Sequence, residues 1–562
     1  MREPGGNDDA GETITTATKI ILDRDRESLS SLSSPLMGLI DDNDNETKNV
    51  VVDKNSSRSR LVFNLNGGNV ILRWSVLIIT LTYFISMVHG QQAQYSCPAR
   101  SEISPCLCTV KKNGLDILCE FTDSQHISKA MAALKGKTMV IYYLKLRHNQ
   151  LKKLQGFIFL GLDIRHLTIH NSTLAAVEES SLSSIGKGLT QLDVSQNSLS
   201  SVPSVAFKNL HHLLILNMNH NRVSAIHSRA FEGLDTLEIL TLYENKLVNI
   251  DSDAFRGLEK KLKRLNLGGN DLTSVPQKAL SVLENLKKLE MQENQISKIE
   301  EGDFEGLRNL DSLGLAHNHL REIPPRVFSH LTLLNSLEME GNSISVVDEE
   351  AFAGLEANLQ YLRLGDNNLH QIPTTALRRL HRLRHLDLRS NNITVIAEDA
   401  FSGYGDSITF LNLQKNDIKQ LPPLGFENLN SLETLNLQNN KIQHIPEEIM
   451  EPIVDTLRVV DIMDNPLICD CELVWYADWL KSLRGKDDEM MQKKRIVCTM
   501  GEHREYDLQN LPLDVMGCVN KNMGRTSLNG GNQNNIHLYY FSLLVTFGTV
   551  ALGNNFNYYY VF

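Results

Sequence analysis

The sequence has little of what a nucleic-acid-binding protein needs. Only 6% of its residues are aromatic, and 56 basic against 67 acidic side chains give a formal net charge of −11. A nucleic-acid-binding domain normally presents a basic face, so this balance argues against that class. The 41% of apolar residues argues against a chain that is disordered throughout. Its 562 residues suit several ordinary domains or one long repeat array.

Motifs that carry common enzyme chemistry are also missing. The sequence has no glycine-rich loop to hold a phosphate, no His-Glu-x-x-His pair for a metal and no Gly-x-Ser-x-Gly turn for a nucleophilic serine. We therefore predict that the chain is not an enzyme and that it uses no cofactor and no metal.

Cysteine is absent from the long middle of the chain and gathers on either side of it. Two groups of four bracket this stretch: Cys97, Cys106, Cys108 and Cys119, then Cys469, Cys471, Cys498 and Cys518. Two even-numbered groups indicate disulfide staples formed in an oxidising compartment, which argues against a cytosolic protein. Spacing alone allows three connectivities within each group. Zinc binding is the alternative, and an oxidising compartment disfavours it.

The stretch without cysteine consists of repeats. Their unit is apolar-x-apolar-x-x-Asn-x-apolar, as in residues 192–199. Fourteen units follow one another at intervals of 23 to 25 residues, Ser172 replaces Asn in one of them, and the others carry Asn149, Asn197, Asn221, Asn245, Asn270, Asn294, Asn318, Asn342, Asn367, Asn391, Asn416, Asn440 and Asn465. This interval is typical of leucine-rich repeats. It predicts an α/β-type solenoid, a horseshoe whose short strands form a parallel sheet on the concave side.

Two positions of the unit have structural explanations. The Asn closes the turn, and its buried amide needs hydrogen bonds that neighbouring turns can provide. About ten residues later comes a row that we expect to pack in the core towards the convex side: Phe207, Phe231, Phe255, Leu280, Phe304, Phe328, Phe352, Leu377, Phe401 and Phe426. Histidines at turn and strand positions are interpreted as polar surface residues, among them His148, His170, His220 and His317.

Both cysteine groups carry a specific motif. The first contains Cys97-Pro98 and Cys106-Leu107-Cys108, and the second contains Asn465-Pro466, then Cys469-Asp470-Cys471, Trp475 and Trp479. Over residues 97–518 the chain resembles extracellular leucine-rich repeat proteins with a cysteine cap at each end, such as Slit, the Nogo receptor and connectin. The resemblance implies a disulfide module at both ends of the solenoid. It further implies the pairs Cys97–Cys108, Cys106–Cys119, Cys469–Cys498 and Cys471–Cys518.

The amino-terminal part divides at an apolar run over residues 74–88. This run is short for a membrane span of about 20 residues and is typical of a signal peptide, with cleavage before Gln91. An uncut signal anchor and a true start further downstream are the alternatives. We expect a disordered leader over residues 1–70, the signal peptide or anchor over 71–90, the first cap over 97–138, the repeats over 139–465 and the second cap over 466–518.

A polar linker over residues 519–536 then leads to an apolar tail over 537–562. No Lys or Arg follows the tail's apolar run, whereas a single-pass span usually has a basic cytoplasmic flank. Small residues, a polar spacer and a terminal apolar run are typical of a lipid-anchor signal, with Asn529 of Asn529-Gly530-Gly531 as the attachment residue. A transmembrane tail, or neither form of attachment, is the alternative.

These features predict a cell-surface protein that enters the secretory pathway and binds an extracellular protein, or mediates adhesion, through its concave face. Candidate binding residues lie between and after the inward apolar pair: Tyr243, Glu244, Glu290, Gln292, Glu293, His317, Glu338, Glu340, Arg363, Asp366, Arg389 and Lys415. The acidic middle of this set suits a partner with a basic patch. Asn171 and Asn392 lie in sequons and are predicted glycosylation sites. A secreted accessory or matrix-assembly subunit is the alternative function.

Overall fold

The structure is a computed structural model, and it describes residues 95–136, 139–482, 496–501 and 504–518. Contacts divide the chain into two units, Met1–Gly90 and Gln91–Phe562, of which the first lies wholly outside the described residues. The predicted leader, signal segment, linker and tail, with Asn529, also lie outside them. Within the described ranges, no helix is both long and apolar enough to span a membrane.

The second unit is built on a 16-stranded sheet with one antiparallel pair at its beginning. β1 (Leu107–Lys111) runs antiparallel to β2 (Gly114–Glu120), and every later strand is parallel to its neighbour. These later strands, in spatial order, are β3 (Val140–Arg147), β5 (Asp163–His170), β7 (Gln191–Asp193), β8 (Ile215–Asn217), β10 (Ile239–Thr241), β12 (Arg264–Asn266), β13 (Lys288–Glu290), β14 (Ser312–Gly314), β16 (Ser336–Glu338), β18 (Tyr361–Arg363), β19 (His385–Asp387), β20 (Phe410–Asn412), β21 (Thr434–Asn436) and β22 (Val459–Asp461).

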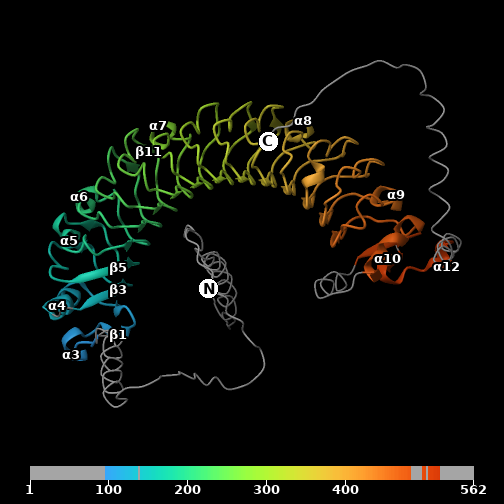
Figure 1. Cartoon of the computed structure of the whole chain (residues 1–562). Coiled ribbons are helices and arrows are strands. Elements are labelled where there is room, and N and C mark those ends of the chain that lie inside the picture. The colour runs from blue at the N-terminus through green and yellow to red at the C-terminus, as the bar shows by residue number, and fades with distance from the viewer. Residues whose placement is uncertain (1–94, 137–138, 483–495, 502–503, 519–562) are drawn as a thin grey trace, which may run out of the picture. The chain divides into compact units, whose positions relative to one another are not determined.

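Short helices and two-stranded pairs complete the turns. The helices are α3 (Arg100–Ile103), α4 (Ser124–Leu134), α5 (Ser180–Ser183), α6 (Ser204–Phe207), α7 (Gln277–Leu280), α8 (Thr374–Leu377), α9 (Glu447–Met450), α10 (Val474–Ser482) and α12 (Leu513–Met516). The strand pairs are β4 (Lys153–Leu154) with β6 (Ala176–Val177), β9 (Ala225–Ile226) with β11 (Asn249–Ile250), β15 (Glu322–Ile323) with β17 (Val346–Val347), and β23 (Val497–Met500) with β24 (Arg504–Asp507). In Figure 1 the sheet follows the inner side of the arc, whereas helices α6 to α9 lie on its outer side.

The repeat interval sets the register of the sheet. Leu240 of β10 pairs with Leu216 of β8 and Leu265 of β12, so residues one interval apart are neighbours in space. All three leucines are fully buried, and they belong to one apolar core that runs through the whole solenoid. The residues on either side of each leucine point outward because side chains alternate along a strand. The predicted horseshoe solenoid with a parallel concave sheet is confirmed.

The asparagines form the predicted hydrogen-bonded ladder. Asn245 Nδ2 donates to the carbonyl oxygens of Met218 and Leu242, each at 3.0 Å, and its Oδ1 accepts from the Val223 N–H at 3.1 Å. This amide thus ties its own turn to the preceding one and pairs buried backbone groups of both. In its place, Ser172 Oγ lies 3.2 Å from the Leu146 carbonyl oxygen and 3.0 Å from that of His170, to which its one O–H can donate, and it accepts the Asn149 N–H at 3.3 Å.

The row of phenylalanines packs in the core, as predicted. Phe231 stacks on Phe255 with ring centroids 6.0 Å apart, and Phe328 lies 5.8 Å from Phe304. Leu280 and Leu377 fill the same position and are fully buried. They end α7 and α8, which lie on the outer side of the arc in Figure 1, so this row closes the core on the convex side.

Disulfide modules cap both ends of the solenoid, as the fold prediction required. The bonds are Cys97–Cys108, Cys106–Cys119, Cys469–Cys498 and Cys471–Cys518, the same pairs that the resemblance implies. At the carboxy-terminal end, Trp475 Nε1 donates to the Ile445 carbonyl at 2.8 Å and Tyr476 OH donates to the Val460 carbonyl at 3.1 Å. These bonds attach α10 to the last turns and cover an apolar core that would otherwise face water.

Candidate binding face on the concave sheet

Four outward positions recur in each turn of the concave sheet. They lie six, four, two and one residues before the ladder Asn, and we call them columns 1 to 4. In the turn of Asn391 they are His385, Asp387, Arg389 and Ser390. Because residues one interval apart pair in register, each column runs from strand to strand across the sheet.

The twelve predicted binding residues all fall in columns 2, 3 and 4. The five in column 4 are exposed, and they are Glu244, Glu293, His317, Asp366 and Lys415. The other seven are half-buried, and they are Tyr243, Glu290, Gln292, Glu338, Glu340, Arg363 and Arg389. The structure therefore gathers the predicted residues on one face, spread over the turns from Asn245 to Asn416.

Column 4 has a left-handed backbone at every turn. Its non-glycine residues have φ between 47° and 57°, and they are His148, Asn171, Gln196, His220, Glu244, Glu293, His317, Asp366, Ser390, Lys415, Asn439 and Asp464. Glycine takes this position as Gly269 and Gly341, with φ of 64° and 69°. A side chain in this region carries a backbone cost that glycine avoids. Side chains in column 4 are thus tolerated at some cost in stability.

Column 2 has a structural role in seven turns. Its Asp or Asn oxygen accepts a hydrogen bond of 2.9–3.1 Å from the N–H two residues later, at Asp193, Asn217, Asn266, Asp387, Asn412, Asn436 and Asp461. The other seven turns lack this Asp or Asn: three carry Lys145, Thr168 and Thr241, and four successive turns, those of β13, β14, β16 and β18, carry Glu290, Gly314, Glu338 and Arg363. This interruption is visible in the sequence, and it marks side chains that the turn itself does not need.

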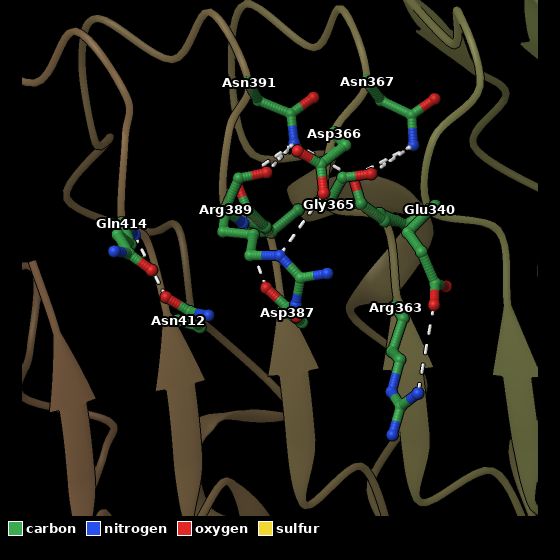
Figure 2. Close-up of polar contacts among 12 residues, drawn as sticks. Glu340, Arg363, Gly365, Asp366, Asn367, Asp387, Arg389, Asn391, Asn412 and Gln414 are labelled. Carbon is green, nitrogen blue, oxygen red and sulfur yellow. Dashed lines mark hydrogen bonds and ion pairs between the residues drawn. The ribbon is translucent and has the colours of Figure 1, made fainter. Parts of the chain in front are cut away.

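Acidic residues of the predicted set are paired with basic residues of the same face. Arg264 Nε and Nη2 donate to the two carboxylate oxygens of Glu290 at 2.9 and 3.0 Å, and Lys288 Nζ lies 3.3 Å from the same carboxylate. Neither cation is among the predicted residues. Further along, Arg389 pairs with Asp387 and with Asp366, the latter at 3.3 Å (Figure 2). The concave face is therefore less acidic than the predicted binding residues alone suggest.

Arg363 is held more loosely than the other two arginines. Its Nη1 lies 3.5 Å from Glu338 and 3.9 Å from Glu340, and Figure 2 shows the contact with Glu340. Arg264 and Arg389 make shorter contacts. The Glu340 side chain is only 14% exposed, and its Oε2 is buried without a hydrogen-bond partner among the described residues. Burial raises the pKa of the Glu340 carboxyl. An unpaired buried acceptor costs free energy unless a donor reaches it.

An aromatic stack lies in column 1 of three adjacent strands. The rings of Tyr361 and His385 lie 5.9 Å apart, and His385 and Phe410 are parallel at 4.0 Å. Tyr361 is 42% exposed. Burial, with Arg363 and Arg389 nearby, lowers the pKa of His385 to about 4, so its ring is neutral at physiological pH. The predicted set omits column 1, although aromatics in one repeat position of three successive units are visible in the sequence.

The predicted glycosylation residues both lie on the surface. Asn171 is exposed in column 4, and its Nδ2 lies 3.1 Å from His148 Nδ1. Asn392 is exposed directly after the ladder residue Asn391. Side-chain access is a condition for modification, so glycosylation of these residues stays a prediction.

Away from the sheet, His444, Asp470 and Glu472 bring ligand atoms within 4.8 Å of one another. His444 Nδ1 lies 2.6 Å from Asp470 Oδ2, while Asp470 Oδ1 accepts the Glu472 N–H at the start of a short helix. A helix cap and an ion pair explain this arrangement. On the sheet, His170 Nδ1 lies 2.9 Å from Ser195 Oγ, which places a hydroxyl beside a base.

The family follows from the sequence pattern together with this geometry. The Leucine rich repeat family matches residues 163–223, 187–247, 219–260, 260–320, 308–357, 357–418 and 406–467, which together cover more than half of the chain. The chain is a leucine-rich repeat protein. Leucine-rich repeats typically provide extended concave surfaces for binding rather than catalytic sites.

Solved structures with this leucine-rich repeat fold support the assignment. A leucine-rich repeat protein of Leptospira interrogans is 26% identical, with a TM-score of 0.51 over 63% of this chain and 85% of that chain. TLR13, in a complex with ssRNA13, is 24% identical, with a TM-score of 0.54 over 64% of this chain and 55% of that chain. Drosophila Toll, in a complex with Spatzle, is 23% identical, with a TM-score of 0.50 over 71% and 56%. The alignments thus cover little more than half of the TLR13 and Toll chains, and these two likenesses show the fold alone.

Proposed function

We propose that this leucine-rich repeat protein is an extracellular recognition protein that binds another protein, or mediates adhesion, through its concave sheet. The observation that carries the proposal is the run of turns in which column 2 departs from its structural Asp or Asn. There the sheet presents acidic, basic and aromatic side chains that neither the core nor the turns require. Tyrosine and arginine are enriched among residues that dominate binding energies, and both lie on this face.

A protein partner suits this surface better than a nucleic acid does. TLR13 and Toll are described in complexes with an RNA and with Spatzle, so the fold accommodates different ligands. From Glu244 to Arg389, columns 1 to 4 carry seven acidic side chains and four Lys or Arg side chains. Phosphate groups would be repelled by this excess of negative charge, whereas a protein with basic residues would be attracted.

Disulfide caps support an extracellular location, since such bonds persist in oxidising compartments. The proposal includes the predicted domain limits and membership of the Slit, Nogo receptor and connectin group. It also includes entry into the secretory pathway through the segment 71–90 and glycans on Asn171 and Asn392. Lipid attachment at Asn529 is part of the same proposal. Treatment of intact cells with phosphatidylinositol-specific phospholipase C should release the protein, and a tag after Phe562 that remains on the mature protein would contradict a lipid anchor.

Recognition can be tested with cells that express the full chain. Such cells would be incubated with a panel of purified extracellular proteins, and binding would be measured by flow cytometry. Tyr243→Ala and Lys415→Ala should each weaken a partner's binding by about 1–2 kcal/mol, because they truncate side chains on the concave face. Glu349→Ala, an exposed change outside columns 1 to 4, is the matched control. A partner that is insensitive to both concave changes would contradict this site.

A further inference from the structure

The turn of β14 forms a gap in the outward side chains of the sheet. Columns 2 and 3 of this turn carry Gly314 and Ala316, which extend little from the backbone. Longer polar side chains border the gap, with Gln292 on one side and Glu338 and Glu340 on the other. A Cβ on Gly314 would lie 3.5 Å from Gln292 Oε1 and 3.9 Å from Glu338 Oε2. Side-chain oxygen atoms of Gln292 and Glu338, from the two neighbouring turns, thus both lie close to Gly314.

The charges around this gap favour a cation. Glu338 and Glu340 share Arg363, which lies no closer than 3.5 Å to either, and Arg389 acts on Glu340 without an ion pair to it. Glu340 Oε2 is a buried acceptor for which the described residues supply no donor. A guanidinium group has five N–H donors, so it can satisfy carboxylate oxygens from more than one side chain. A partner's carboxylate would meet repulsion from both glutamates.

The aromatic stack lies within reach of the same partner segment. Tyr361, its most exposed member, is on β18, two strands from β14 and one column away from Gly314. Strands lie about 4.8 Å apart and rise about 3.3 Å per residue, so the two places are roughly 12 Å from each other. An extended chain crosses this distance in about four residues. A flat apolar or aromatic side chain would pack on the stack, because His385 is neutral at physiological pH.

We propose that the concave sheet between β14 and β20 docks a segment of a partner protein that carries an arginine and, about four residues away, an apolar or aromatic residue. The arginine enters the gap over Gly314 and donates to Glu338 and Glu340. The second residue packs on the stack of Tyr361, His385 and Phe410. This assignment rests on the proposed function and specifies the partner's chemistry at one part of the binding face.

A phage library of random dodecapeptides, selected on cells that express the full chain, tests this assignment directly. Enriched peptides should share an arginine about four residues from an apolar or aromatic residue. Their binding should fall about tenfold or more with Glu340→Gln, with Tyr361→Ser, and when citrulline replaces the arginine, since citrulline keeps the shape and removes the charge. Glu349→Gln, an exposed change outside columns 1 to 4, is the matched control and should leave binding unchanged.

Three outcomes would overturn the assignment: enriched peptides without a basic residue, peptides whose binding survives both Glu340→Gln and Tyr361→Ser, or no enrichment at all. Glu340→Gln keeps the size of the side chain, and surface staining of each variant would show that it folds and is exported. A panel protein that needs Tyr243 or Lys415 but tolerates Glu340→Gln would refute this site while the proposed recognition function still stands.

Discussion

The phenol of Tyr243 donates a hydrogen bond of 2.7 Å to Glu293 Oε2, across the intervening turn of Gly268 and Gly269. The two residues are 50 positions apart in the chain, yet no side chain of the glycine turn stands between them. Burial and the contact with Glu293 raise the pKa of Tyr243, so the phenol remains a donor at physiological pH. Two predicted binding residues are thereby joined into one contact surface.

Gly269→Ala should disturb this bridge and destabilise the protein. Its φ of 64° disfavours alanine, and a new Cβ would lie 3.0 Å from the Glu244 nitrogen and 3.1 Å from Tyr243 Cε2. We expect the free energy of unfolding to fall by about 1–3 kcal/mol in urea titrations. Gly314→Ala is the control and should change stability little, because its Cβ would meet only ordinary contacts of 3.5 Å or more. Equal effects of the two changes would contradict this explanation.

Asn245→Ala should cost more, since it removes an entire step of the ladder. The substitution leaves the Val223 N–H without its partner and removes one of two amide donors from each of the Met218 and Leu242 carbonyls, to which Asn221 and Asn270 also donate. We expect a loss of about 2–4 kcal/mol in the free energy of unfolding, as one buried N–H becomes unsatisfied and two further hydrogen bonds are lost. Asn245→Ser should lose less, because Ser172 already serves one turn. Asn209→Ala, at an exposed position, is the control. If it lost as much stability as Asn245→Ala, the hydrogen bonds of the ladder would not explain the loss.

Much of this fold could be predicted because a solenoid makes residues one interval apart into neighbours. The inward leucines, the ladder asparagines and the phenylalanine row follow from that rule alone. Pairing within the outward columns could not be predicted in the same way, since it depends on side-chain rotamers across neighbouring strands. Arg264 reaches Glu290 by such a contact, and the stack of Tyr361, His385 and Phe410 lies in a column that the predicted set left out.

Glu340→Gln should stabilise the protein at neutral pH. Burial raises the carboxyl's pKa on folding, so the folded state binds this proton more readily than the unfolded state. The stabilisation that comes from this tighter proton binding is fully present below the ordinary pKa of a glutamate. It is lost as the pH rises through the pKa of the folded state. At neutral pH the glutamine variant should gain roughly 1 kcal/mol, and this gain should shrink in acid. Melting curves across a pH series would measure it, and a less stable variant at neutral pH would contradict the argument.

Glu350→Gln should change the stability at neutral pH in the opposite direction to Glu340→Gln. A hydrogen bond from Arg326, whose Nε lies 2.7 Å from the carboxylate, lowers the pKa of Glu350. Its contribution to stability is present above the ordinary pKa and is lost as the pH falls through the folded value. The glutamine variant should therefore be slightly less stable than the wild type at neutral pH. The effect should be small, because both side chains are largely exposed.

His385→Phe should make the protein less sensitive to acid. The folded pKa of His385 lies near 4 against an ordinary value of 6.5, because burial disfavours the charged ring. The stability that this neutral ring contributes is present above pH 6.5 and is lost as the pH falls towards 4. Phenylalanine keeps the stack between Tyr361 and Phe410 but cannot take up the proton. The melting temperature of the variant should therefore drop less than that of the wild type between neutral and acidic pH. The exposed His317→Phe is the control, and identical acid sensitivity of the wild type and His385→Phe would show that the stack does not oppose protonation.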